Sequence, residues 1–163
     1  MLYNAKNKSV EIGNTSMNYA EFGNGEKSLI MIPGLGDGLR TDNKLAHMYA
    51  LLYGKFAKDY KVYVFSQKID MPDRYSTKKM AHDIKDAMDI LGVEQADVIG
   101  VSLGGMIAQH LAADYPKLVS KLVLVVTSAR KNQYIQGVSP GWIEMAKRGD
   151  YRRLMVDNLK KMY

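Results

Sequence analysis

The residues best placed to do chemistry are five in a row, Gly100-Val101-Ser102-Leu103-Gly104. A serine hydroxyl can attack a carbonyl carbon only when its oxygen is exposed and the approach path is open. A sharp turn from a strand into a helix meets both conditions. It also crowds the residues two before and two after the serine, where Gly100 and Gly104 carry no side chain. The spacing therefore predicts Ser102 as a catalytic nucleophile, and the alternative is a strand-to-helix turn whose glycines serve packing only.

A second glycine-rich segment follows an earlier apolar run and reads Pro33-Gly34-Leu35-Gly36. Attack on a carbonyl creates an oxyanion that needs two hydrogen-bond donors about 3 Å away. We expect the backbone N–H groups of Leu35 and Leu103 to supply them. A phosphate-binding loop is disfavoured because the Lys-Ser/Thr pair of such loops is absent here.

The elements expected to position these segments alternate along the chain. Strands are predicted at residues 9–12, 16–22, 28–32, 61–66, 97–101 and 121–126. Helices are predicted behind Asp42, after Ser76 and from about residue 104 to 115. An initial hairpin followed by alternating strands and helices predicts an α/β fold, a mostly parallel sheet with helices on both faces. Beyond residue 130 we expect a polar loop ending at Pro140 and then two short helices.

Taken together, these motifs resemble the α/β-hydrolase superfamily, especially its esterase-like and lipase-like serine hydrolases. The resemblance implies an α/β-hydrolase core over residues 1–129 and the beginning of a helical cap over residues 130–163. It implies hydrolysis of an ester or related acyl bond in a small molecule, with no metal and no organic cofactor. The chain departs from the family at Pro33, where many relatives have histidine, and in residues 67–75, which lack a common Gly-x-Gly turn.

The family pattern also requires an acid and a histidine later in the chain than the serine. His110 lies eight residues beyond Ser102, roughly 12 Å along the predicted helix, and is out of reach. His47 and His82 fall in other predicted helices, and Asp150 and Asp157 fall in the cap, where surface positions are expected. We therefore expect a chain truncated after the sixth strand and the start of the cap, and inactive by itself.

Two other functions fit the same residues. One is a non-catalytic member of the fold that binds a ligand or a protein, because a fold does not determine a function. The other is an acyltransferase that uses the same serine but passes the acyl group to an acceptor other than water.

Composition and charge exclude several other classes of protein and of binding partner. The chain has 163 residues and no cysteine, which excludes disulfides and a thiol nucleophile. Residues 130–163 carry eight Lys/Arg against three Asp/Glu, yet no nucleic-acid-binding motif accompanies them. Neither a signal segment nor a run long enough to span a bilayer is present, so we expect a cytoplasmic protein without a membrane or nucleic-acid partner. We also expect self-association, through the sixth strand as an exposed edge or through the C-terminal helices.

Overall fold

The computed structural model describes residues 2–35, 44–130 and 133–162. The chain divides into two compact units, Met1–Ser128 and Ala129–Tyr163. The predicted N-cap Asp42 and the loop residue Gly36 lie outside the described residues.

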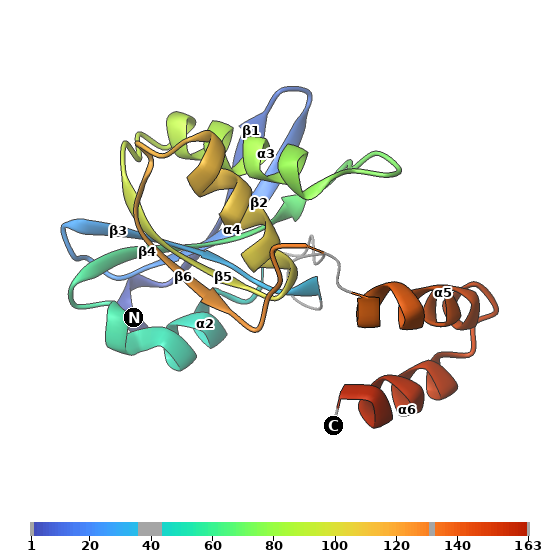
Figure 1. The fold of residues 1–163 in the computed structure, drawn as a ribbon. Helices are drawn as coiled ribbons and strands as arrows, with labels where there is room; N and C mark the ends of the chain where they lie inside the picture. Colours follow the sequence, from blue (N-terminus) through green and yellow to red (C-terminus); the bar gives the residue numbers. More distant parts are fainter. Residues whose placement is uncertain (1, 36–43, 131–132, 163) are drawn as a thin grey trace. The chain divides into compact units, whose positions relative to one another are not determined.

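The first unit is a six-stranded sheet flanked by helices (Figure 1). Its elements, in chain order, are η1 (Leu2–Asn4), β1 (Lys6–Ile12), β2 (Thr15–Phe22), β3 (Lys27–Ile32), α2 (Ala46–Tyr53), η2 (Gly54–Phe56), β4 (Tyr60–Lys68), α3 (Thr77–Ile90), β5 (Ala96–Val101), α4 (Leu103–Asp114) and β6 (Val119–Val125).

The strands lie in the order β1-β2-β4-β3-β5-β6. β1 and β2 form an antiparallel hairpin, β2 joins β4 antiparallel, and β3, β4, β5 and β6 are mutually parallel. The predicted α/β fold with a mostly parallel sheet is confirmed. Parallel strands end at the same side of the sheet, so the segments that follow β3, β4 and β5 gather at one edge.

Two apolar cores lie on the two faces of the sheet. α3 and α4 cover one face, where Ile84, Met88, Ile107 and Leu111 are almost fully buried. α2 covers part of the other face and buries Ala46, Tyr49 and Ala50. The small alanine side chains allow the backbone of α2 to approach the strands closely.

The face of α2 that packs on the sheet differs in part from the one expected. The spacing of Leu45, Met48, Leu52 and Phe56 predicts that these residues form the inner stripe. Leu45 and Phe56 do pack against the core, whereas Met48 is 41% and Leu52 is 60% exposed. The helix is apolar on every side, so periodicity alone does not identify its inner face.

The second unit is a hairpin of two helices, α5 (Gln133–Lys147) and α6 (Tyr151–Met162). The indole N–H of Trp142 donates a hydrogen bond to Asp157 Oδ2 at 2.9 Å, and Lys161 Nζ pairs with the same oxygen at 2.8 Å. Asp150 accepts a hydrogen bond from the backbone N–H of Arg153 at the start of α6. Asp150 and Asp157 thus both have roles in building this hairpin.

The polar loop expected up to Pro140 is a wrong prediction, because α5 continues through that residue. A proline inside a helix removes one backbone hydrogen bond and costs about 3 kcal/mol. Contacts with α6 on both sides of Pro140 offset this cost, through Trp142 and through the Tyr134 hydroxyl, which donates to the carbonyl of Lys161.

Candidate active site

Ser102 occupies the turn between β5 and α4, where its side chain is exposed. Its backbone has φ 52° and ψ −115°, a combination that residues with a side chain rarely adopt. Such a conformation costs about 1–3 kcal/mol and persists only where the surrounding structure enforces it.

Hydrogen bonds on both sides of the residue enforce this turn. The N–H of Ser102 donates to the carbonyl of Val125 in β6 at 2.9 Å. The carbonyl of Ser102 accepts from the N–H of Gly105 at 3.0 Å and from the hydroxyl of Thr127 at 2.7 Å. The serine backbone is therefore held by the neighbouring strand, by its own helix and by the segment that follows β6.

The two glycines of the motif lie where side chains do not fit. A Cβ on Gly104 would lie 1.9 Å from the carbonyl oxygen of Ile32, at the end of β3. A Cβ on Gly100 would lie 2.7 Å from the Cβ of Ala108 and 2.6 Å from the carbonyl oxygen of Gly104. Both glycines let α4 start directly against the strands, which places its first N–H groups next to Ser102.

The segment after β3 approaches the same serine. A Cβ on Gly34 would lie 3.2 Å from Ser102 Cβ and 3.9 Å from its Oγ. Leu35 follows, with its side chain 59% exposed, and Leu103 is the first residue of α4. The sheet topology thus brings together the two segments that sequence spacing selects, 68 positions apart at Gly34 and Ser102.

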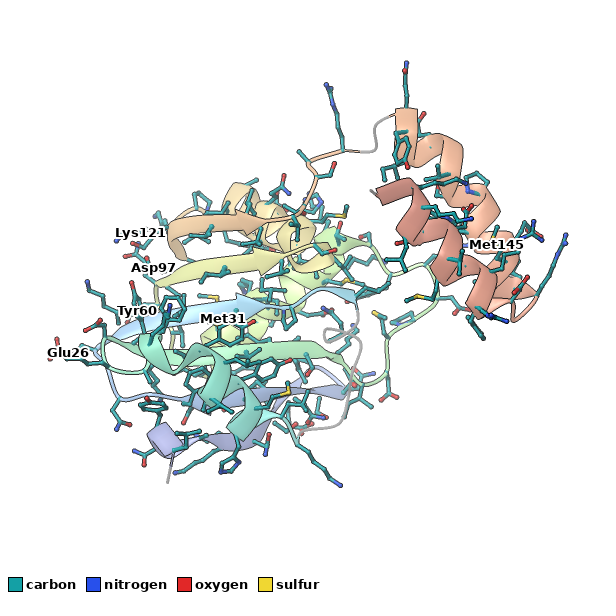
Figure 2. All side chains as sticks on the ribbon, turned by 90° about the horizontal axis from the view of Figure 1, so that it is seen from below. Glu26, Met31, Tyr60, Asp97, Lys121 and Met145 are labelled. Carbon is teal, nitrogen blue, oxygen red and sulfur yellow. The ribbon has the colours of Figure 1, made fainter. Side chains whose placement is uncertain are left out.

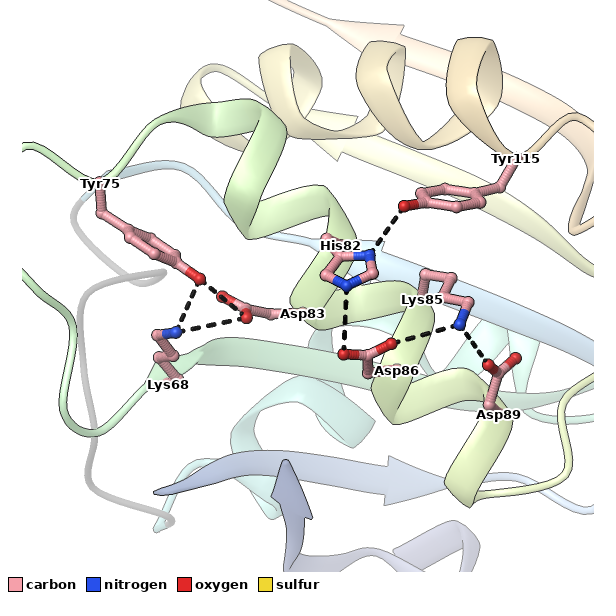
Figure 3. Close-up of polar contacts among 8 residues, drawn as sticks. All are labelled: Lys68, Tyr75, His82, Asp83, Lys85, Asp86, Asp89 and Tyr115. Atoms are coloured by element: carbon pink, nitrogen blue, oxygen red, sulfur yellow. Dashed lines mark hydrogen bonds and ion pairs between the residues drawn. The ribbon is translucent and has the colours of Figure 1, made fainter. Parts of the chain in front are cut away.

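The three histidines of the chain lie on helices rather than in the turn. His82 Nδ1 is 2.8 Å from the Tyr115 hydroxyl, and its Nε2 pairs with Asp86 on the outer side of α3 (Figure 3). His47 is exposed near the start of α2, and His110 lies two turns along α4. Among the hydrogen bonds of the described residues, none joins a histidine or an acid to the hydroxyl of Ser102.

A partly buried polar cluster at the end of β4 was not predicted from the sequence. Lys68 Nζ is 2.6 Å from the Tyr75 hydroxyl, which donates to Asp83 Oδ1 at 2.9 Å (Figure 3). Lys68 also lies 3.4 Å from Asp83, whose side chain is nearly buried. The cluster ties the end of β4 to α3 across the segment that departs from the family pattern.

An extra residue in β4 aims Lys68 at that cluster. Tyr19 pairs with Phe65, but Met17 pairs with Lys68, so one more residue separates the pairs on β4 than on β2. A bulge of this kind reverses the alternation of side chains. Lys68 therefore shares the face of Met17 and Phe65 and reaches α3. In the sequence, the only sign of this cluster is a charged residue, Lys68, at the end of a largely apolar strand.

Comparison with known proteins matches residues 27–162 to the family described as alpha/beta hydrolase fold. The chain belongs to the alpha/beta hydrolase fold family. It is 26% identical over 154 residues to a 2-hydroxy-6-oxononadienedioate/2-hydroxy-6-oxononatrienedioate hydrolase of a Pseudomonas species, which covers 91% of this chain and 53% of that protein. It is 25% identical over 139 residues to epoxide hydrolase 1 of Caenorhabditis elegans, covering 85% of this chain and 34% of that protein.

Solved structures agree with this assignment. A hydrolase from Pseudomonas aeruginosa superposes with a TM-score of 0.65 at 26% identity, covering 86% of this chain and 51% of that one. An alpha/beta hydrolase fold protein from Chitinophaga pinensis has a TM-score of 0.69 at 22% identity, covering 90% and 53%. This alpha/beta hydrolase chain thus spans about half the length, or less, of the relatives it matches.

Within the described residues, no three His, Asp or Glu side chains gather as a metal site. No described helix is both long and apolar enough to cross a membrane.

Proposed function

We propose that this alpha/beta hydrolase cleaves an ester or related acyl bond of a small molecule through an acyl-enzyme at Ser102. The backbone of Ser102, at φ 52° and ψ −115° between β5 and α4, carries the proposal. Strained residues held by several hydrogen bonds are concentrated at functional sites, and here the strain presents a hydroxyl to solvent.

In the proposed reaction, Ser102 Oγ bonds to the carbonyl carbon while a base takes the hydroxyl proton. The oxyanion accepts hydrogen bonds from the N–H groups of Leu35 and Leu103. The bond to the leaving group then breaks, and the leaving group takes the proton. Water attacks the acyl-enzyme in the same manner, which releases the acid and restores the serine. The N-terminus of α4 favours the developing negative charge.

The proposal requires a base that the three histidines of this chain do not provide. His82 is engaged with Tyr115 and Asp86, and His110 lies roughly 12 Å from Ser102 along α4. We therefore expect the 163-residue chain to turn over simple esters well below about 1 s⁻¹, a rate typical of slow enzymes.

The names of the relatives support hydrolysis but do not identify the type of bond that this chain would cleave. One acts on an oxo-dienedioate and another on an epoxide, according to their names. The serine hydroxyl at the centre of this site favours acyl chemistry, because an alkoxide attacks a carbonyl carbon and is readily released by water from an ester.

A second candidate is a non-catalytic binding member of the fold. The specific observation in its favour is that no described acid or histidine is bonded to Ser102. The exposed hydroxyl of Ser102 and the segment at Gly34 that lies close to it would then serve ligand binding without bond cleavage.

Chemical rescue separates the two candidates. The chain is incubated with a fluorophosphonate probe and increasing imidazole, which supplies the missing base, and labelled residues are mapped by mass spectrometry. We expect labelling of Ser102 to rise with imidazole and to vanish in Ser102→Ala. The matched control is Ser120→Ala, an exposed serine on β6, which should label like the parent chain. Labelling that is absent at every imidazole concentration, or unchanged in Ser102→Ala, favours the binding function.

A further inference from the structure

Val126, the residue that follows β6, has a backbone conformation that its side chain disfavours. Its φ is 45°, in the left-handed region that glycine enters without steric cost. Valine branches at Cβ, and a branched residue at positive φ is uncommon and marks a turn or a strained site. Packing within the described residues does not account for the valine, because its side chain is 82% exposed there.

Hydrogen bonds on both sides of Val126 hold it beside Ser102. The carbonyl oxygen of Val125 accepts from the N–H of Ser102 at 2.9 Å, and the Thr127 hydroxyl donates to the carbonyl oxygen of Ser102 at 2.7 Å. The first bond places the Cα of Val126 within roughly 6 Å of the Ser102 nitrogen, because a carbonyl oxygen lies only about 2.8 Å from the Cα of the next residue. The strained residue is therefore a direct neighbour of the candidate nucleophile.

Two further contacts keep this segment from relaxing. Gln109 Nε2, on α4, donates to the carbonyl of Ser128 at 3.3 Å. Thr127 packs against Gly105, where a Cβ would lie 2.5 Å from the Cβ of Thr127. Strain persists only where the surrounding structure enforces it, and it is concentrated at functional sites. Val126 meets both conditions.

Ser102 lies between a segment without a side chain and a segment with a stiff apolar one. β5 lies between β3 and β6 in the sheet. Figure 2 shows these parallel strands side by side, with Asp97 and Lys121 near the amino ends of β5 and β6. The segments that follow the strands therefore meet at the opposite edge, with Gly34 on the β3 side of Ser102 and Val126 on the β6 side.

This asymmetry orients a substrate whose carbonyl carbon bonds to Ser102. Leu35, one of the two proposed oxyanion donors, follows Gly34 on the β3 side. A carbonyl carbon directs its two other substituents away from its oxygen, so an oxygen held near Leu35 leaves those substituents towards the β6 side. The side chain that they meet there is Val126, which has two methyl groups and no group that forms hydrogen bonds.

We propose that Val126 is a specificity-determining residue, whose methyl groups contact an apolar substituent of the substrate's carbonyl carbon and limit its size. The inference rests on the proposed acyl chemistry at Ser102. Glycine would form the same turn without strain. Valine instead adds a short side chain with restricted rotation, which forms a fixed wall rather than an adaptable surface.

Two fluorophosphonate probes that differ only in their alkoxy group, ethoxy or cyclohexyloxy, test the proposal in the presence of imidazole. The measured quantity is the rate of Ser102 labelling by the ethoxy probe divided by the rate for the cyclohexyloxy probe. Val126→Gly opens space and should lower this ratio at least about threefold, whereas Val126→Ile removes space and should raise it at least about threefold.

An isosteric variant tests whether the wall must be apolar. Val126→Thr keeps the branched shape and the backbone strain but exchanges one methyl group for a hydroxyl. It should also raise the ratio, because a hydroxyl loses its hydration when the larger apolar group covers it. If Val126→Gly fails to fold, as judged by circular dichroism, the isoleucine and threonine variants still decide.

Urea unfolding separates backbone strain from substrate contact. Val126→Gly should keep or raise the midpoint of unfolding, since glycine adopts a φ of 45° without strain. The matched control is Arg74→Gly, at an exposed residue with φ 56° that follows β4, which β3 separates from β5. This control should affect the midpoint in the same direction and leave the labelling ratio unchanged.

Two outcomes would overturn this inference alone. The first is a labelling ratio that is the same in the parent chain, Val126→Gly and Val126→Ile. The second is a ratio that changes in Val126→Gly but not in Val126→Ile, which indicates that the strain of the backbone matters and the side chain does not. A parent chain in which neither probe labels Ser102 at any imidazole concentration would instead contradict the proposed function, and with it the inference.

Discussion

The hydroxyl of Thr127 donates a hydrogen bond of 2.7 Å to the carbonyl oxygen of Ser102, linking the segment after β6 to the strained turn after β5. Thr127 also fills the space above Gly105, where a Cβ would lie 2.5 Å from the Cβ of Thr127. The conformation of the candidate nucleophile therefore depends on a residue 25 positions further along the chain.

Replacing Thr127 by valine keeps its shape and removes the hydroxyl. We expect a loss of about 1 kcal/mol in the free energy of unfolding, the usual contribution of one hydrogen bond. Imidazole-dependent labelling of Ser102 should fall, because its backbone is less firmly held. Thr127→Ser, which retains the hydroxyl, should label more strongly than Thr127→Val, and equal labelling of the two would show that the bond does not position Ser102.

The glycine at position 104 should not tolerate even a methyl group. Its Cβ would lie 1.9 Å from the carbonyl oxygen of Ile32, so α4 must shift away from β3 in Gly104→Ala. We expect destabilisation of about 3 kcal/mol or more, at the upper end for single substitutions. The control is Gly137→Ala on α5, where no atom lies within 4 Å of the new Cβ. That change should be neutral or stabilising by up to about 1 kcal/mol, as measured by urea unfolding.

Alkaline pH should weaken the Lys68 cluster. Burial opposes the charge of Lys68, but the hydrogen bond with Tyr75 and the charge of Asp83 outweigh it and raise the lysine pKa above 10.5. Burial also raises the pKa of Tyr75 above 10.0, assisted by Asp83 and opposed by Lys68. Both groups bind protons more tightly in the folded state. Their contribution is therefore complete below about pH 10 and declines as the pH rises through the folded pKa values.

Tyr75→Phe tests this expectation through the pH dependence of urea unfolding between neutral pH and about pH 11. The variant should lose stability near neutral pH by about 1 kcal/mol, and the gap to the parent chain should narrow above pH 10. The other tyrosines titrate in both proteins and cancel in the difference. Tyr151→Phe, at a residue that is 64% exposed, serves as the control, and a gap of constant size would contradict the prediction.

The helical hairpin should depend on the Trp142–Asp157 contact. Trp142→Phe removes the indole donor and should cost about 1 kcal/mol in the local stability of α5 and α6. Hydrogen exchange of the backbone amides in residues 133–162 reports this directly. Lys147→Ala removes an exposed ion pair with Glu144 and should change exchange little, since such pairs contribute at most about 1 kcal/mol. Equal effects of the two variants would contradict the prediction.

Much of the fold is readable from local patterns. The apolar runs at β3, β5 and β6 identify parallel strands, although β6 is largely exposed in the structure. Gly100 and Gly104 identify the turn, because only glycine fits against Ile32 and Ala108. These features follow from short-range sterics, which a sequence displays directly.

Other features depend on partners far along the chain. The inner face of α2 is set by the strands beneath it, and Pro140 is accommodated because α6 packs alongside α5. The orientation of Lys68 follows from a bulge that appears only when β4 is paired with β2. No pattern of apolar and polar residues within 60–68 reveals that bulge.

The order of strands in the sheet has a consequence for how the protein forms during synthesis. β3 is made before either of its neighbours, since β4 and β5 both follow it in the chain but lie on its two sides. A chain emerging from the ribosome therefore carries this very apolar strand with both edges open until β4 has been made, and with one edge open until residue 101 has been made. The β1–β2 hairpin can form at once from local contacts, while the centre of the sheet must wait. Nascent chains of this protein should accordingly bind holdase chaperones most strongly while β3 is exposed and β5 is still missing.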